Sequence, residues 1–438
     1  MKPFVVKPVE RLQGQAQLPG DKSIAHRAII LSALAQGKTS IKNFPLNDDC
    51  LATISVFKKL GVRISQGNII CVFGKGLTGF KKPKGPIFIN ESGTTLRLLL
   101  GVLAGQNFPV RIYAGRHLSQ RPMARVTRPL RLMGALIHGK AGKWASGQME
   151  EYPPIMIKKG VLKGITYELP VASAQVKSAL LLAGLFVKEE TKVIESVKTR
   201  DHTERMLKFF RAAIKVKDNA VTINGSGKLV SPGSIYVPGD ISSAAFFLVA
   251  ASLLPNSKVI LKKVGLNPSR AGIINVLKRM KAEIKIKNYK SNGEPMADIE
   301  VKSSRLHATR ITKKEIPSLI DELPVLMVAS SLANGRTVIE GAQELRVKET
   351  DRINSMIENL SKMGAKIISA EKGSQENITI EGVGCLKAAK LKSYGDHRTA
   401  MSMIVAGLTA DGNSVIDDIS CISKSFPDFI KSLKALRP

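Results

Sequence analysis

The segment around Lys22 combines residue types that could bind an anion. Gly20-Asp21-Lys22-Ser23 is followed one turn later by Arg27. The glycine lets backbone approach a ligand closely, the lysine supplies a mobile cation, and the arginine supplies a two-pronged donor. Taken alone the segment is a weak signal, because the aspartate or the serine could simply cap a helix.

The densest charged motif in the chain is RVKETDR, which begins at Arg346. Lys348 and Glu349 are adjacent, and Arg352 lies four residues after the lysine, on the same face if the segment is helical. A cation–carboxylate pair beside a substrate would suit proton transfer, since neighbouring charges tune each pKa. An exposed ladder of helical salt bridges is the alternative interpretation.

Further cations occur near other expected helix starts. A loop around Pro122 is rich in arginine, and cations also occur at Arg398 and Lys424. The arginines in and around that loop are Arg111, Arg116, Arg121, Arg125 and Arg128. Each segment taken singly is explained as well by a solvated surface. At equivalent points of a repeat, together they favour a substrate site.

The polar residues belong to a segment that recurs six times. Each copy has a polar or glycine-bearing start followed by an apolar run, and the copies lie about 70–80 residues apart. They begin at Gly20, Ser92, Ser173, Gly239, Asp321 and Gly395. The runs are apolar nearly all the way round, which predicts helices buried on every side. Because a helix N-terminus presents free N–H groups to anions, converging helix starts would make a phosphate and carboxylate receptor.

Amphipathic helices and β-branched runs lie between the copies. The amphipathic helices are expected within 48–61, 121–134, 201–213, 269–282 and 348–364. With 438 residues, too many for one core, two domains are expected. We predict an α/β fold of two similar domains, each of three strand–helix units with buried parallel helices at the centre and sheets outside, an inside-out α/β barrel. One domain comprises 1–20 and 238–438, and the other 21–237.

The composition narrows the class of protein. Lysine and arginine outnumber aspartate and glutamate by 67 to 35, a net charge of +32 that attracts anions of any kind. Four scattered cysteines fit reduced thiols in the cytoplasm, and the six histidines show no metal-binding spacing. No apolar stretch is long enough to span a bilayer. We expect a cytoplasmic protein without a metal.

Eight segments in chain order carry a family resemblance. They are PGDKSIAHR, NESGTTLR, RPM, VASAQVKSALLLAGL, RDHTERM, RVKETDRI, GDHRTAM and SKSFPDF. The chain thereby resembles the 3-phosphoshikimate 1-carboxyvinyltransferase family, also called 5-enolpyruvylshikimate-3-phosphate synthases, from about Pro19 to Phe429. The resemblance implies transfer of the enolpyruvyl group of phosphoenolpyruvate to the 5-hydroxyl of shikimate 3-phosphate, with release of phosphate. It implies no cofactor, and a role in aromatic amino acid biosynthesis.

The resemblance also assigns site residues. Shikimate 3-phosphate would be bound by Lys22, Ser23, Arg27, Ser173, Ala174, Gln175, Arg200, Asp321 and Lys348. Phosphoenolpyruvate would be bound by Lys22, Gly93, Arg121, Gln175, Arg352, Arg398 and Lys424. Asp321 would accept the hydroxyl proton, and Glu349 or Lys22 would move the proton at the methylene carbon. The 21–237 domain would serve shikimate 3-phosphate and the other phosphoenolpyruvate, with domain closure as the gate.

One departure and two alternatives accompany this assignment. Glu91 stands where many relatives have asparagine, and it would repel phosphoenolpyruvate unless it turned away or paired with a cation. The sister enzyme that uses a UDP-amino sugar usually has Lys-Asn where this chain has Lys22-Ser23. A nucleic-acid binder would fit the charge, but only 5% of residues are aromatic and no stacking motif occurs. We therefore expect a monomer with two small substrates and no specific nucleic acid or membrane partner.

Overall fold

The chain forms two compact units. The computed structural model describes residues 3–143, 147–225, 227–372 and 375–437. Unit 1 comprises Met1–Pro19, Pro238–Ser291 and Pro295–Pro438, and unit 2 comprises Gly20–Val237 and Asn292–Glu294. Each unit has its own hydrophobic core. The chain therefore begins in unit 1, forms unit 2, and returns.

Three apolar helices form the interior of unit 2. They are α1 (Lys22–Leu34), α3 (Gly93–Ala104) and α5 (Ala174–Gly184), and nearly every residue of each is buried. Helices α3 and α5 approach closely at Gly101, where an added Cβ would lie 2.1 Å from the carbonyl oxygen of Ala179. Only glycine permits this distance. The two helices therefore pack backbone to backbone.

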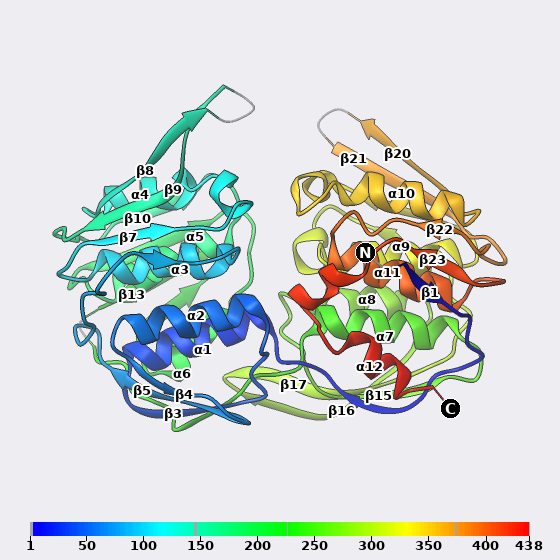
Figure 1. Cartoon of the computed structure of the whole chain (residues 1–438), viewed down its shortest axis with the longest axis horizontal. Helices are drawn as coiled ribbons and strands as arrows, with labels where there is room; N and C mark the ends of the chain where they lie inside the picture. Colours follow the sequence, from blue (N-terminus) through cyan, green and yellow to red (C-terminus); the bar gives the residue numbers. More distant parts are fainter. Residues whose placement is uncertain (1–2, 144–146, 226, 373–374, 438) are drawn as a thin grey trace. The chain divides into compact units, whose positions relative to one another are not determined.

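Three amphipathic helices and three sheets complete unit 2. The helices are α2 (Asp48–Lys59), α4 (Ala124–Leu132) and α6 (His202–Phe209). The sheet order is β14-β3-β5-β4 in the first, β6-β7-β9-β8 in the second and β10-β11-β13-β12 in the third. Each contains one parallel pair followed by two antiparallel pairs. In Figure 1, strands β3, β4 and β5 lie beneath α1 and α2.

The strands of unit 2 are short. Those of the first sheet are β3 (Gln36–Lys42), β4 (Arg63–Ser65), β5 (Ile69–Lys75) and β14 (Ser234–Tyr236). Those of the second are β6 (Ile87–Phe88), β7 (Val110–Tyr113), β8 (Leu136–Lys143) and β9 (Met149–Lys158). Those of the third are β10 (Thr166–Leu169), β11 (Glu190–Glu195), β12 (Ala213–Lys217) and β13 (Ala220–Asn224).

Unit 1 repeats the arrangement. Its buried helices are α7 (Ile241–Leu253), α9 (Leu323–Ser331) and α11 (His397–Leu408), and they pack on one another. Its other helices are α8 (Gly272–Arg279), α10 (Arg352–Lys362) and α12 (Phe429–Lys434). Its sheets have the orders β16-β17-β15-β2, β18-β19-β21-β20 and β1-β23-β22. Figure 1 shows α7 above the sheet that contains β15.

The strands of unit 1 come from both ends of the chain. The first sheet has β2 (Gln13–Gln17), β15 (Lys258–Gly265), β16 (Glu283–Asn292) and β17 (Glu294–Lys302). The second has β18 (Arg310–Ile311), β19 (Arg336–Glu340), β20 (Lys366–Lys372) and β21 (Gln375–Glu381). The third has β1 (Phe4–Val6), β22 (Lys390–Leu391) and β23 (Ser414–Ile416). Residues near the N-terminus therefore complete two sheets whose other strands follow much later.

The predicted mixed α/β class is confirmed, but one predicted helix starts later than expected. Helix α10 begins at Arg352, and Lys348 has an extended backbone after a 3₁₀ helix at Gln343–Val347. Asp351 caps α10 by accepting hydrogen bonds from Ile353 N (3.1 Å) and Asn354 N (3.0 Å). Aspartate is more favourable as the N-cap, just before the first helical residue, than in the interior of a helix. The predicted common helical face for Lys348 and Arg352 is therefore wrong.

Candidate functional site

The start of α1 holds two of the predicted cations of unit 2. Asp21 caps the helix by accepting a hydrogen bond from Ile24 N (2.9 Å). Lys22 is the first helical residue, and its ammonium forms an ion pair with Asp49 of α2. The side chain of Lys22 is 36% exposed, so its ammonium is accessible to a ligand.

Arg27, one turn later, is buried among uncharged partners. Its guanidinium donates to Thr203 Oγ1 (2.6 Å), Ser178 Oγ (2.9 Å) and the carbonyl oxygen of Ser23 (2.9 Å). Burial lowers the pKa of Arg27 to about 10, so the group remains charged at neutral pH. A buried cation whose direct partners are neutral is prepared to receive an anion.

Gln175 links α5 to α3. Its amide oxygen accepts a hydrogen bond from Arg97 (2.9 Å), and its amide nitrogen donates to Thr94 Oγ1 (3.0 Å). Burial, followed by repulsion from Arg121 and Arg125, lowers the pKa of Arg97 to about 10. The glutamine therefore lies beside a group of cations, as expected of a residue that contacts anionic substrates.

Gly93 opens α3 next to two arginines. A Cβ added there would lie 3.1 Å from Arg97 Nη1 and 3.4 Å from Arg121 Nη1. The residue just before it, Ser92, caps the helix by accepting a hydrogen bond from Thr95 N (3.3 Å). The start of α3 thus presents backbone N–H groups with two guanidinium groups beside them, which favours an anion.

The carboxylate of Glu91 is bound by backbone N–H groups. Its carboxylate accepts hydrogen bonds from Leu118 N (2.7 Å) and His117 N (3.3 Å). These amides begin the 3₁₀ helix Leu118–Gln120, and Arg121 follows it directly. Glu91 therefore fixes the loop that carries Arg121, and its charge is compensated by backbone donors.

The loop after β11 carries Arg200, and the start of α5 carries Ser173. Ser173 caps α5 by accepting a hydrogen bond from Val176 N (3.4 Å), and Ala174 is the first helical residue. Arg200 is half-buried, and it lies close enough to Arg27 for repulsion to oppose that residue's charge. Unit 2 therefore gathers the cations predicted for one phosphate.

Asp321 of unit 1 lies among three arginines. Its carboxylate oxygens are 3.2 Å from Arg270 Nη1, 3.7 Å from Arg352 Nη1 and 3.8 Å from Arg398 Nη2. Arg398 also donates to the backbone oxygen of Asp321 (2.9 Å). Burial opposes the charge of Arg398, but Asp321, Glu322 and Asp240 raise its pKa. The predicted proton acceptor and two predicted phosphoenolpyruvate ligands are therefore in contact.

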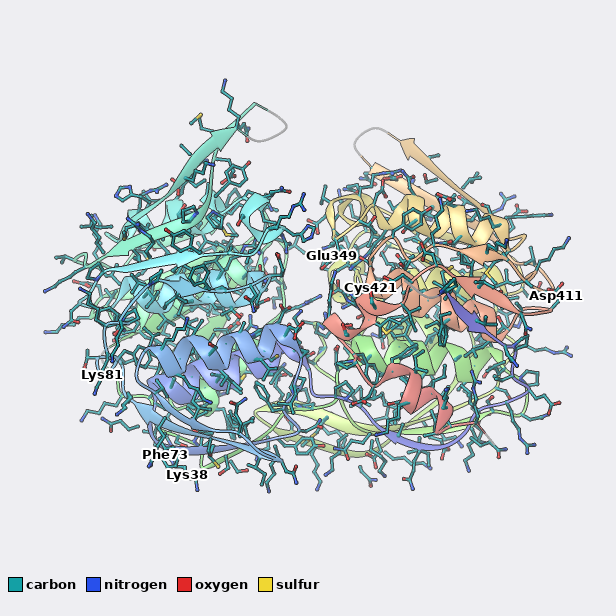
Figure 2. All side chains as sticks on the ribbon, in the orientation of Figure 1. Lys38, Phe73, Lys81, Glu349, Asp411 and Cys421 are labelled. Atoms are coloured by element: carbon teal, nitrogen blue, oxygen red, sulfur yellow. The ribbon has the colours of Figure 1, made fainter. Side chains whose placement is uncertain are left out.

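Arg352 joins this group to Glu349. The guanidinium is fully buried and donates to Asp396 Oδ2 (3.0 Å) and Glu349 Oε2 (2.6 Å). Partial burial opposes ionisation of Glu349 (labelled in Figure 2), but Arg352, His397 and Arg398 lower the pKa of its carboxyl to about 2. Glu349 is therefore a carboxylate at neutral pH, suited to accept a proton.

The two predicted lysines of unit 1 lie apart from this contact. Lys348 Nζ is 3.9 Å from Glu344, one turn earlier in the sequence, and no other ion pair of Lys348 occurs among the described residues. Lys424 is exposed, and its ammonium donates to the carbonyl oxygen of Gly395 (3.5 Å). The structure thus brings Lys424 to the loop before α11 but does not bring Lys348 to Asp321.

Sequence reasoning missed Arg270. This buried arginine donates to Ser242 Oγ (2.6 Å) and lies 3.5 Å from Asp240 and 3.8 Å from Glu322, besides its contact with Asp321. The signal that identifies it is the repeat. Arg121, Arg200 and Arg270 each stand two or three residues before an amphipathic helix, namely α4, α6 and α8.

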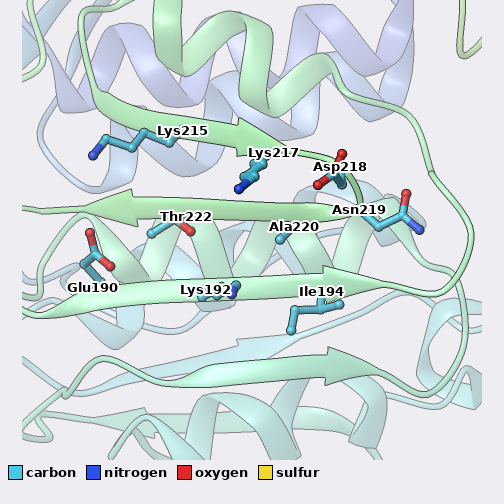
Figure 3. A pocket seen from close by; sticks show the side chains of 9 residues that line it. All are labelled: Glu190, Lys192, Ile194, Lys215, Lys217, Asp218, Asn219, Ala220 and Thr222. Atoms are coloured by element: carbon cyan, nitrogen blue, oxygen red, sulfur yellow. The ribbon is translucent and has the colours of Figure 1, made fainter.

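One hollow in unit 2 lies away from these residues. It measures about 600 Å³ and lies on the outer face of the β10-β11-β13-β12 sheet. Figure 3 shows its lining side chains, among them Lys192, Lys215 and Lys217 around Thr222 and Ala220. None of the predicted site residues lines it, so we do not assign the reaction to it.

Within the residues that the structure describes, no three His, Cys, Asp or Glu side chains are grouped as metal ligands would be. No helix in the same residues is both long and apolar enough to cross a membrane. All four cysteines are free thiols.

Comparisons with known proteins give a consistent result. Residues 6–433 match the family described as EPSP synthase (3-phosphoshikimate 1-carboxyvinyltransferase). The chain is 45% identical to the 3-phosphoshikimate 1-carboxyvinyltransferase of Geobacter sp. (strain M21) over 435 residues, 99% of each chain. It is also 45% identical to the enzyme of that name from Bacillus cytotoxicus over 427 residues, 97% of this chain and 98% of the other.

The solved structures agree with the sequences. EPSP synthase from Acinetobacter baumannii superposes with a TM-score of 0.91 at 40% identity, covering 100% of this chain and 98% of the other. The resemblance inferred from eight segments is confirmed over nearly the whole length. The chain belongs to the EPSP synthase family, transferases that carry out the enolpyruvyl transfer of the shikimate pathway to aromatic amino acids.

Proposed function

We propose that the helix-start residues of the two units bind shikimate 3-phosphate and phosphoenolpyruvate and carry out the transfer. The observation that carries this proposal is the concentration of guanidinium groups in the first turns of helices in both units. In unit 2, the direct partners of Arg27 and Arg97 among the described residues are uncharged. In unit 1, Arg352 and Arg398 contact Asp321. The arginines can thus bind the anionic substrates, and Asp321 can accept a proton.

Shikimate 3-phosphate is assigned mainly to unit 2. Its ligands there are Lys22, Ser23, Arg27, Ser173, Ala174, Gln175 and Arg200. Arg27 and Arg200 supply two cations, and the start of α5 supplies free backbone N–H groups. A phosphate dianion is matched by this combination of guanidinium forks and helix-start amides. Asp321 and Lys348 are the predicted ligands from unit 1.

Phosphoenolpyruvate is assigned to cations of both units. They are Lys22, Arg121, Arg352, Arg398 and Lys424, with Gly93 and Gln175 as uncharged ligands. The contact distances around Gly93 support its role, because Arg97 and Arg121 leave little room for a side chain there. Several cations are needed because the substrate carries a phosphate and a carboxylate, and these cations also stabilise charge that develops during the reaction.

The proton transfers are assigned to carboxylates of unit 1. Asp321 accepts the proton of the 5-hydroxyl as that oxygen bonds to the central carbon of phosphoenolpyruvate, while the methylene carbon gains a proton. In the second step the resulting methyl group loses a proton and the bond to phosphate breaks. Glu349 is ionised at neutral pH, because Arg352 and Arg398 lower the pKa of its carboxyl although burial opposes this. It therefore suits the second, proton-removing step, and Lys22 is the candidate donor in the first.

The same proposal includes the finer architecture. We interpret each unit as an inside-out α/β barrel of three repeats around parallel buried helices, with unit 2 serving shikimate 3-phosphate and unit 1 phosphoenolpyruvate. We further propose a cytoplasmic monomer. The support is the predicted reduced state of the four scattered cysteines and the two separate cores, each complete within one chain.

The test is release of phosphate from the two substrates without added metal. The wild-type protein should release phosphate only when both substrates are present, and Asp321→Ala should lose most of this activity. A fully active Asp321→Ala variant would leave the transfer intact and exclude this residue as the proton acceptor. Transfer to UDP-N-acetylglucosamine, with none to shikimate 3-phosphate, would overturn the substrate assignment.

A further inference from the structure

Unit 2 contains a buried charge cluster that the proposed mechanism does not use. Lys177 of α5 lies with its Nζ 2.8 Å from Glu195 Oε2 and 2.5 Å from Glu204 Oε1. The side chains are 1%, 4% and 5% exposed, respectively. Burying three ionisable groups opposes folding, and such a group needs paired contacts to be tolerated. A role beyond packing is therefore worth seeking.

One side of the cluster reaches the loop that carries Arg200. Glu195 ends β11, and its Oε1 accepts hydrogen bonds from the backbone N of Thr199 (3.2 Å) and from the Thr199 hydroxyl. Thr199 directly precedes Arg200. Since Lys177 binds the other oxygen of Glu195, the lysine connects the Arg200 loop to the first turn of α5.

The other side of the cluster reaches Arg27. Glu204 lies in the first turn of α6 beside Thr203, and Thr203 Oγ1 is 2.6 Å from Ser178 Oγ and from Arg27 Nε. Lys177 and Ser178 of α5 therefore face Glu204 and Thr203 of α6 as two adjacent contacts. The first turns of these helices are fastened together next to the buried guanidinium.

The cluster has more negative than positive groups. One lysine serves two carboxylates, and Glu204 Oε2 is buried with no hydrogen-bond partner among the described residues. Burial raises the pKa of Glu204 despite the nearby lysine. Packing alone does not require this arrangement, because an apolar side chain would fill the same space without an unsatisfied oxygen.

We propose that Lys177, Glu195 and Glu204 are positioning residues that hold Arg200, Arg27 and the start of α5 in one arrangement for the phosphate of shikimate 3-phosphate. This inference rests on the proposed function, in which those groups bind that phosphate. The cluster does not touch the substrate. It fixes the loop on one side and α6 on the other, so that the cations do not have to be ordered when the substrate binds.

Steady-state kinetics of three variants test the proposal. Thr199→Val removes only the hydroxyl donor, and the side chain is not in the core, so this variant should fold. Glu195→Gln leaves Lys177 and Glu204 as a one-to-one pair. Lys177→Met leaves two buried carboxylates without their cation. For Thr199→Val and Glu195→Gln we expect the KM for shikimate 3-phosphate to rise about tenfold, the size of one hydrogen bond to a charged group.

The matched control is Thr222→Val, on the outer face of the same sheet (Figure 3). This control variant should leave both KM values unchanged. In Thr199→Val, the KM for phosphoenolpyruvate should also stay at the wild-type value. Arg200→Gln removes the cation of the loop itself, and its KM for shikimate 3-phosphate shows how large an increase that removal causes. Lys177→Met should show the largest rise, accompanied by a lower midpoint of thermal unfolding.

The outcomes separate the two proposals. If the wild type turns over both substrates but Thr199→Val and Glu195→Gln keep the wild-type KM for shikimate 3-phosphate, the positioning role is overturned and the function stands. An equal rise in both KM values, or a loss confined to kcat, also overturns it. A wild type that neither binds shikimate 3-phosphate in calorimetry nor releases phosphate overturns the function and this inference together.

Discussion

Both units have arginines at or near the starts of helices, but the surroundings of these arginines differ. In unit 2, and within the part of the chain that the structure describes, Arg27 and Arg97 donate to hydroxyl, amide and carbonyl oxygens. In unit 1, Arg352 and Arg270 contact carboxylates directly. The balance of burial and nearby charge differs as well: burial lowers the pKa of Arg27 to about 10 although nearby carboxylates oppose this, whereas carboxylates outweigh burial and raise the pKa of Arg398.

The difference teaches what each unit is prepared to do. A buried arginine with neutral partners gains most from an incoming anion, because no protein charge has to be displaced. Arginines already interleaved with carboxylates gain less, but they control the ionisation of those carboxylates. Unit 2 is therefore a receptor for anions, and unit 1 combines anion binding with proton transfer. Lys22 of unit 2 differs from Arg27 and Arg97, because it pairs with the carboxylate of Asp49.

The strongest test of this contrast is Asp321→Asn in unit 1. The amide oxygen still accepts hydrogen bonds from the arginines, but the group no longer accepts a proton at neutral pH. We expect kcat for phosphate release to fall by about 10² to 10⁴, the usual contribution of a general base. Binding of shikimate 3-phosphate, followed by calorimetry, should change far less than kcat. A variant that retains more than a tenth of the wild-type rate would exclude Asp321 as the acceptor of the hydroxyl proton.

The corresponding change in unit 2 is Arg27→Lys. One ammonium cannot reach Thr203, Ser178 and the Ser23 carbonyl together, so the charge remains but its geometry is lost. We expect the KM for shikimate 3-phosphate to rise about 10- to 100-fold, with a smaller change in kcat. Arg336→Lys serves as the control, because Arg336 is 67% exposed and its pair with Glu381 is on the surface. Equal effects of the two substitutions would argue against a receptor built around Arg27.

A third test uses a buried histidine of unit 2. Burial, together with Lys22 and Arg27, lowers the pKa of His26 well below its ordinary value of 6.5. The unfolded chain therefore takes up this proton first, and stability falls as the pH drops below about 6.5, by at most ~1.4 kcal/mol per pH unit for one histidine. The midpoint of thermal unfolding, measured from pH 7.5 to 4.5, should fall less steeply for His26→Asn than for the wild type. His397 of unit 1, whose pKa burial lowers to about 3, should still contribute a slope. Identical slopes would mean that His26 is not neutral in the folded state.

The smallest expected effect belongs to Glu91→Gln. The carboxylate accepts from two backbone amides, so it stabilises the loop before Arg121 rather than repelling the substrate. Replacing it should raise the KM for phosphoenolpyruvate only about two- to fivefold, the size of a charge at a helix start. Glu91→Ala, which also removes the acceptor, should raise it further. A marked fall in the KM for phosphoenolpyruvate would instead show that the Glu91 carboxylate repels this substrate. The description of unit 2 as an anion receptor free of opposing charge would then be wrong.

How much of this could be predicted depends on sequence separation. The buried helices and their polar starts were predictable, because periodicity and capping act within a few residues. The partners of Arg27 were not, since Thr203 and Ser178 lie 176 and 151 positions away. The start of α10 was missed because Asp351 competes locally as a cap. Arg270 needed the repeat to be applied to a second set of helices.

The pairing of the N-terminal strands has a consequence for biosynthesis. β2 pairs in parallel with β15, and β1 pairs with β23 near the opposite end of the chain. On the ribosome, residues 20–237 are made before β15. At that point every strand of the three sheets of unit 2 has been made, whereas unit 1 has only β1 and β2, which still lack their partner strands. We expect nascent chains halted before Ser414 to leave β1 open to protease while unit 2 resists cleavage. β1 can therefore enter its sheet only after β23 has been made, late in synthesis.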